Sequence, residues 1–151
     1  MEPGAAKGGF ILLALIGGAI LPLQALINAR LGAGLGGPIW AAMLSFLIGT
    51  ITLAAFLLAL RAPMPGLHAT TALPWWVWTG GLLGAIYVSS VIIAVPALGA
   101  TALVAFVILG QLLAATLLDH YGVLGAVRTI NPARAMGVLL LILGAMLVVR
   151  H

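Results

Sequence analysis

Residues 38–60 read PIWAAMLSFLIGTITLAAFLLAL, a run that contains no charged side chain. About 20 apolar residues in a helix rise about 30 Å, which is the thickness of the hydrocarbon core of a bilayer. Inside lipid, backbone polar groups must be satisfied within the protein, so only helices and closed barrels cross a membrane. The run is unbroken and lacks the short alternating segments of a barrel strand. It therefore predicts a transmembrane helix.

The same pattern recurs along the chain, in which only 5% of the residues are charged. We predict an all-α membrane protein, built as a single five-helix domain over residues 1–151. Proline in the first turn marks three of the helix starts, at Pro38, Pro74 and Pro132, and Asn131 is the expected N-cap of the last. Pro22 lies inside the first helix and predicts a kink or local break there. The predicted helices cover residues 9–29, 38–60, 74–95, 100–118 and 132–149.

The basic residues lie at the ends of these helices rather than on one face, which favours anchoring at the lipid interface over nucleic-acid binding. With the N-terminus in the cytoplasm, the bias of Lys and Arg between the two sides is weak, and five helices put the termini on opposite sides. A nearly balanced chain can insert both ways or mainly with its N-terminus inside. Insertion in both orientations would allow pairing as an inverted repeat, so the expected partner is a second copy of the chain in an inverted orientation. The inner side would hold Lys7, Arg61, Arg128 and Arg134, and the outer side Arg30 and Arg150.

Few polar side chains lie within the helices, so each can be weighed singly. Gln24 and Asn28 are four residues apart and share one helix face beside Pro22. Such amides either form hydrogen bonds between helices or line a substrate cavity, and the sequence leaves both interpretations open. Tyr87 brings a hydroxyl to mid-membrane depth, and Gln111 is the strongly polar residue of the fourth helix. The candidate substrate-binding residues are Gln24, Asn28, Tyr87 and Gln111.

Pairs of glycines at helical spacing occur in the third and fifth helices. Small residues allow neighbouring helices to approach closely, so these glycines predict packing rather than chemistry. The packing residues are Gly80, Gly84, Gly137 and Gly144.

The sequence contains no recognisable set of catalytic residues. The three histidines fall in loops or at the terminus, the two acids are far apart, and the chain has no cysteine. Intramembrane hydrolysis needs a nucleophile with a base, paired acids or metal ligands. We therefore expect no catalytic residue, no metal site and no cofactor.

Several stretches resemble one family of membrane proteins. Residues 24–32 read QALINARLG, residues 74–81 read PWWVWTGG, and residues 110–122 read GQLLAATLLDHYG. Together with Gly137 and Gly144, they resemble the half-size, five-helix proteins of the drug/metabolite transporter superfamily. The resemblance covers nearly the whole chain. It implies an inverted pair of five-helix units, a cavity lined by the first, third and fourth helices of each, and a last helix used in packing.

The chain is more distantly similar to the four-helix small multidrug resistance proteins. Those proteins use an acid within the first helix for proton coupling, and this sequence has Gln24 and Asn28 but no acid there. With no formal charge at mid-membrane depth, neutral or weakly charged, partly apolar solutes are the expected substrates.

These features predict a multi-pass inner-membrane transporter that moves a small molecule by alternating access in a homodimer. A dual-topology ion channel and a non-transporting membrane subunit remain alternatives. Arg30 and Asp119 would meet between inverted subunits and could act as gates at each face. The competing interpretation is that Arg30 reaches the headgroups and Asp119 caps or anchors a loop.

Overall fold

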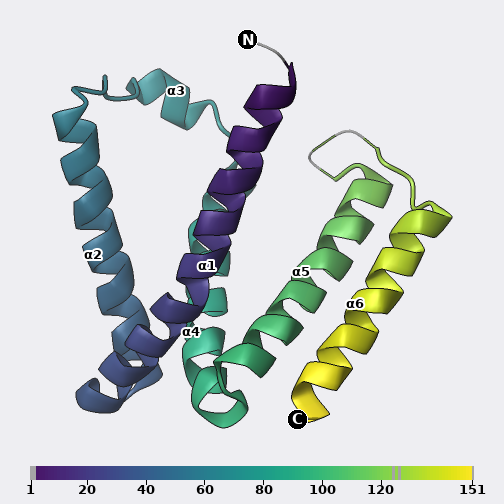
Figure 1. Cartoon of the computed structure of the whole chain (residues 1–151). Coiled ribbons are helices and arrows are strands. Elements are labelled where there is room, and N and C mark those ends of the chain that lie inside the picture. Colours follow the sequence, from purple (N-terminus) through teal and green to yellow (C-terminus); the bar gives the residue numbers. More distant parts are fainter. Residues whose placement is uncertain (1–2, 124, 126, 151) are drawn as a thin grey trace. The chain divides into compact units, whose positions relative to one another are not determined.

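The computed structural model of the protein describes residues 3–123, 125 and 127–150 (Figure 1). Five of its helices are long and apolar enough to cross a membrane, which confirms the predicted number of spans. The third span begins with a short 3₁₀ helix and continues as an α-helix. The elements are α1 (Pro3–Leu35), α2 (Pro38–Ala59), α3 (Leu67–Thr71), η1 (Trp75–Thr79), α4 (Gly80–Leu98), α5 (Ala100–Tyr121) and α6 (Pro132–Arg150).

α1 extends beyond the predicted residues 9–29 at both ends, and α4 and α5 end three residues later than predicted, at Leu98 and Tyr121. α1 runs without interruption through Pro22, so the helix has no break there. Proline removes one backbone hydrogen bond, and the remaining bonds on both sides keep the helix continuous. α4 likewise includes Pro96, which the sequence pattern had placed in a connection. The connection between α4 and α5 is therefore the single residue Gly99, whose φ of 75° is in the left-handed region that favours glycine.

The described helices form two compact units, Met1–Ala97 and Leu98–His151, which we describe separately. In the first unit, α1 and α2 meet at a tight turn, where the Gly37 amide donates to the Gly32 carbonyl at 2.9 Å. A side chain at Gly32 would lie 3.5 Å from the Cβ of Ala41, so the two helices approach closely here. The core beside this turn joins α2 and α4. It contains Ala41, Ala42 and Ile92, with Leu31 and Val88 packed against it.

The second unit is a hairpin of α5 and α6, which lie side by side (Figure 1). α5 ends at Tyr121, and the C-cap residue Gly122 has a φ of 64°. A Cβ at this glycine would come within 2.6 Å of the Val127 side chain. The Arg134 amide donates to the Asn131 side-chain oxygen at 2.8 Å, which confirms Asn131 as the N-cap of α6.

Four hydroxyl groups within the spans bond to their own helices. Each donates to the carbonyl oxygen four residues earlier, as serine and threonine commonly do in helices. These polar groups are therefore satisfied without a neighbouring helix. The pairs are Thr50 with Phe46, Thr52 with Ile48, Ser90 with Ile86 and Thr116 with Leu112.

Candidate functional site

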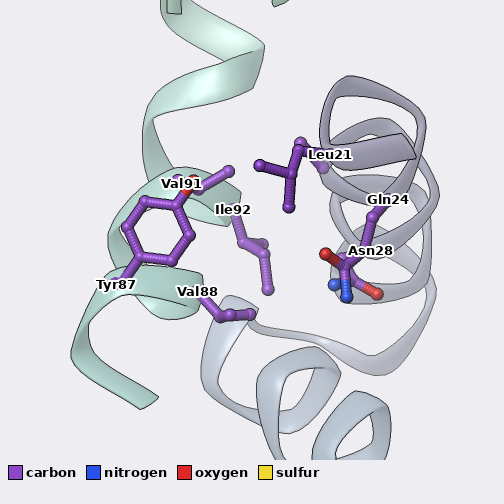
Figure 2. Close-up of a pocket in the computed structure, with 8 residues that line it drawn as sticks. Leu21, Gln24, Asn28, Tyr87, Val88, Val91 and Ile92 are labelled. Carbon is purple, nitrogen blue, oxygen red and sulfur yellow. The ribbon is translucent and has the colours of Figure 1, made fainter. Parts of the chain in front are cut away.

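A narrow notch lies on the seam between α1 and α4 in the first unit (Figure 2). One wall comes from a single face of α1, because Leu21, Gln24 and Asn28 follow one another at helical spacing. Tyr87 and its neighbours on α4 form the facing wall. Apart from the two amides and the phenol, the lining is aliphatic. The complete lining is Leu21, Gln24, Ala25, Asn28, Tyr87, Val88, Val91 and Ile92.

Asn28 is unusual among the residues of the notch because it is polar and buried. Only 5% of its surface is exposed, and it is the buried polar residue of the described chain. Within that described chain, its side chain makes no hydrogen bond. No fully enclosed side-chain nitrogen or oxygen among the described residues lacks a partner, so the Asn28 amide must reach the open space of the notch. An amide can both donate and accept hydrogen bonds, and no described residue uses either capacity of Asn28.

The notch itself is small. It offers about 10 Å³ to the centre of a water-sized sphere, which is about the space that one water molecule needs. The unit alone can therefore take one small polar group beside Asn28, but not a complete metabolite.

A larger hollow of about 330 Å³ continues along the same seam toward the α1–α2 turn. Its walls are small residues of α1 and the C-terminal part of α4. Ile92 lines both this hollow and the notch, and only 3% of its surface is exposed. The lining of the hollow is Ala29, Gly32, Ala33, Pro38, Ile92, Ile93 and Pro96.

The structure brings together three of the four predicted substrate-binding residues, Gln24, Asn28 and Tyr87. Gln111 lies on an exposed face of α5 in the second unit, and its part in the site stays a prediction. The sequence analysis missed Ile92 and Pro96. Their spacing of four residues was visible, but an aliphatic residue gives no polar signal that would set it apart from ordinary packing.

Asp119 has a partner within its own unit. Its carboxylate lies 3.6 Å from a guanidinium nitrogen of Arg134, and its carbonyl accepts the Arg128 amide at 2.8 Å. Arg134 also donates to the Arg128 carbonyl, and the Ile130 amide donates to Nδ1 of His120. These contacts are those of a loop anchor. Arg30 is exposed, and its pairing with Asp119 across subunits stays a prediction.

The predicted packing glycines differ in their surroundings. A Cβ at Gly84 would lie 3.5 Å from the Phe46 ring, so α4 approaches α2 at this point. Gly137 borders a groove between α5 and α6. Among the described residues, nothing lies within 4 Å of a Cβ at Gly80, Gly137 or Gly144, so their role in packing also stays a prediction.

Residues 9–147 match the family model DMT_YdcZ, described as "Putative inner membrane exporter, YdcZ". The chain belongs to this family. No curated protein and no solved structure matches it. Membership confirms the resemblance to the half-size drug/metabolite transporters. It also fits a transporter rather than an enzyme.

Family membership and the five spans together define the setting of the notch. The protein is a multi-pass protein of the inner membrane, and its general function is membrane transport. The notch therefore lies on the seam of two spanning helices, where an amide without a partner is costly.

Proposed function

We propose that the chain exports a small molecule by alternating access, with Gln24, Asn28 and Tyr87 contacting the solute. The observation that carries this proposal is the Asn28 amide, which is buried on the α1–α4 seam without a hydrogen bond. Leaving such a group unpaired costs about 1 to 3 kcal/mol. A solute that supplies the missing hydrogen bonds would recover that free energy on binding.

The transporting form in this proposal is a homodimer of inverted copies. The notch has room for about one water molecule, so the remaining walls of a solute cavity must come from elsewhere. Weak Lys and Arg bias and an odd number of spans favour a second copy inserted the other way. Inverted repeats around a site near the midplane are a common basis of alternating access.

Solute flux into proteoliposomes tests the transport function. Purified protein would be challenged with a panel of metabolites while electrical current is recorded on the same preparation. Saturable flux that falls in the Asn28→Leu variant supports the proposal. Fast current without saturation would identify a channel instead, and silence in both measurements would identify a subunit that does not transport.

Topology reporters fused to each terminus test the inverted dimer. We expect both termini to report on both sides of the membrane, in comparable amounts. If every copy has its N-terminus on one side and no oppositely oriented partner protein is present, the inverted homodimer is wrong.

A further inference from the structure

The notch and the larger hollow lie in series along the α1–α4 seam. Asn28 borders the notch, and Ala29, Gly32 and Ala33 continue the wall of α1 toward the α1–α2 turn. Ile92 borders both spaces and is almost completely buried. Ile92 is therefore the residue that the two spaces share.

Pro96 leaves one backbone carbonyl of α4 without its usual hydrogen-bond donor. Proline has no amide hydrogen, so the carbonyl of the residue four positions earlier loses its helical donor. That residue is Ile92, and Ile92 and Pro96 both line the larger hollow. The seam thus offers two successive hydrogen-bonding stations, the Asn28 amide and the Ile92 carbonyl. The Ile92 carbonyl lacks its usual donor four residues later, and the Asn28 side chain makes no hydrogen bond to a described residue.

We propose that Ile92 gates a solute path along the α1–α4 seam, and that the path carries small neutral solutes bearing a hydrogen-bond donor. The solute would pass from the amides of Gln24 and Asn28 to the carbonyl of Ile92 once the Ile92 side chain moves aside. The inference rests on the proposed transport function, because it assigns a route and a substrate class to the same site.

The chemistry of the two stations selects the solute. Amide and carbonyl groups satisfy a neutral donor but do not neutralise a full charge, and both hollows are lined by uncharged residues. Moving an unpaired charge into such surroundings costs far more than moving a neutral polar group. The carbonyl of Ile92 can only accept, so the solute must carry at least one donor.

Cysteine accessibility tests the path without knowledge of the natural solute. The chain has no cysteine, so each variant carries a single thiol. The probes are methyl methanethiosulfonate, which is neutral, and its trimethylammonium-ethyl analogue, which carries a fixed charge. Rates would be normalised to those with free cysteine. Because the thiolate is the reacting form, a thiol that faces lipid reacts slowly.

We expect Asn28→Cys and Ile92→Cys to react with the neutral reagent at least about tenfold faster than Ile86→Cys. Ile86 is a matched control, since it is an isoleucine of the same helix that is 55% exposed and lines neither hollow. With the charged reagent, the normalised rate at Asn28→Cys should be at least about tenfold lower than with the neutral one.

The gate is tested by a second substitution. Ile92→Ala in the Asn28→Cys background should raise the rate of the neutral reagent several-fold, and Ile86→Ala should leave it unchanged. Since Ile92 also belongs to the core, Ile92→Val provides a milder change, with a smaller increase expected in a protein that retains its packing.

An unchanged rate in both Ile92 variants would overturn the gate, and equal normalised rates for the two reagents would overturn the neutral substrate class. The flux panel gives a separate result. If the thiols react as expected but no solute flux is found, the transport function is refuted while the path stands. If flux is found but the thiols do not react as expected, only the path is refuted.

Discussion

Replacement of Asn28 by leucine should make the protein more stable while removing its transport. Leucine branches at the same carbon as asparagine, and the one-water space of the notch can take its slightly larger methyl groups. Only 5% of the surface of Asn28 is exposed, and its side chain has no hydrogen bond within the described chain. Removing such a group should therefore stabilise the fold rather than weaken it.

The magnitude follows from the cost of an unpaired amide, about 1 to 3 kcal/mol. This range corresponds to a factor of about 5 to 150 in the ratio of folded to unfolded protein. A water in the notch would reduce the gain toward the lower limit, because it would already satisfy part of the amide.

Unfolding by sodium dodecyl sulfate in mixed micelles measures the stability change, and flux in proteoliposomes measures the loss of transport. Gln24→Leu is the matched control. Gln24 lines the same notch from the same helix face but is exposed, so the substitution should change stability by less than about 0.5 kcal/mol while still weakening transport. A clear loss of stability in Asn28→Leu would show that the amide is paired in the assembled protein. The proposed binding role would then be refuted.

Three further predictions concern the rest of the chain. Gly122→Ala should destabilise the α5–α6 hairpin by more than about 1 to 2 kcal/mol, since it combines a left-handed φ with a clash against the Val127 side chain. Gly36→Ala has a similar φ but open space, so it should cost only the conformational part, and unfolding midpoints compare the two variants. Gln111→Leu should weaken solute binding in a flux competition assay and leave the dimer intact on size exclusion, and loss of the dimer would assign Gln111 to assembly instead. Arg30→Asp and Asp119→Arg should each impair transport, and the double variant should recover part of it if the two residues pair between subunits. A double variant no better than the worse single one, without crosslinks between cysteines at the two positions, would exclude the gate.

Much of the fold follows from the sequence because hydropathy and chain length act directly on each segment. The apolar runs could cross the bilayer only as helices, and Pro38 and Asn131 marked helix starts that the structure confirms. The continuity of α1 through Pro22 and the extension of α4 through Pro96 were less predictable. Whether one missing hydrogen bond ends a helix depends on the packing of its neighbours, which the local sequence does not contain.

The polar residues of the candidate site could be predicted from the sequence, but the arrangement of the helices around them could not. Gln24 and Asn28 were recognisable because polar residues in lipid are rare, and their spacing placed them on one face. That Tyr87 faces them depends on how α4 rotates against α1, and hydropathy says nothing of that rotation. Ile92 could not be found from sequence, because its importance comes from lying between two hollows and not from its chemistry.

The self-satisfied hydroxyls of Thr50, Thr52, Ser90 and Thr116 have a consequence for how this family can diversify. Since each hydroxyl is already bonded to its own helix, exchange for alanine or valine removes no contact with a solute. Such positions are free to drift during evolution. Selection for a new cargo would instead act on the few side chains whose hydrogen bonds are still open, above all Gln24 and Asn28. A relative with the same helices but different residues at these two positions should export a different compound.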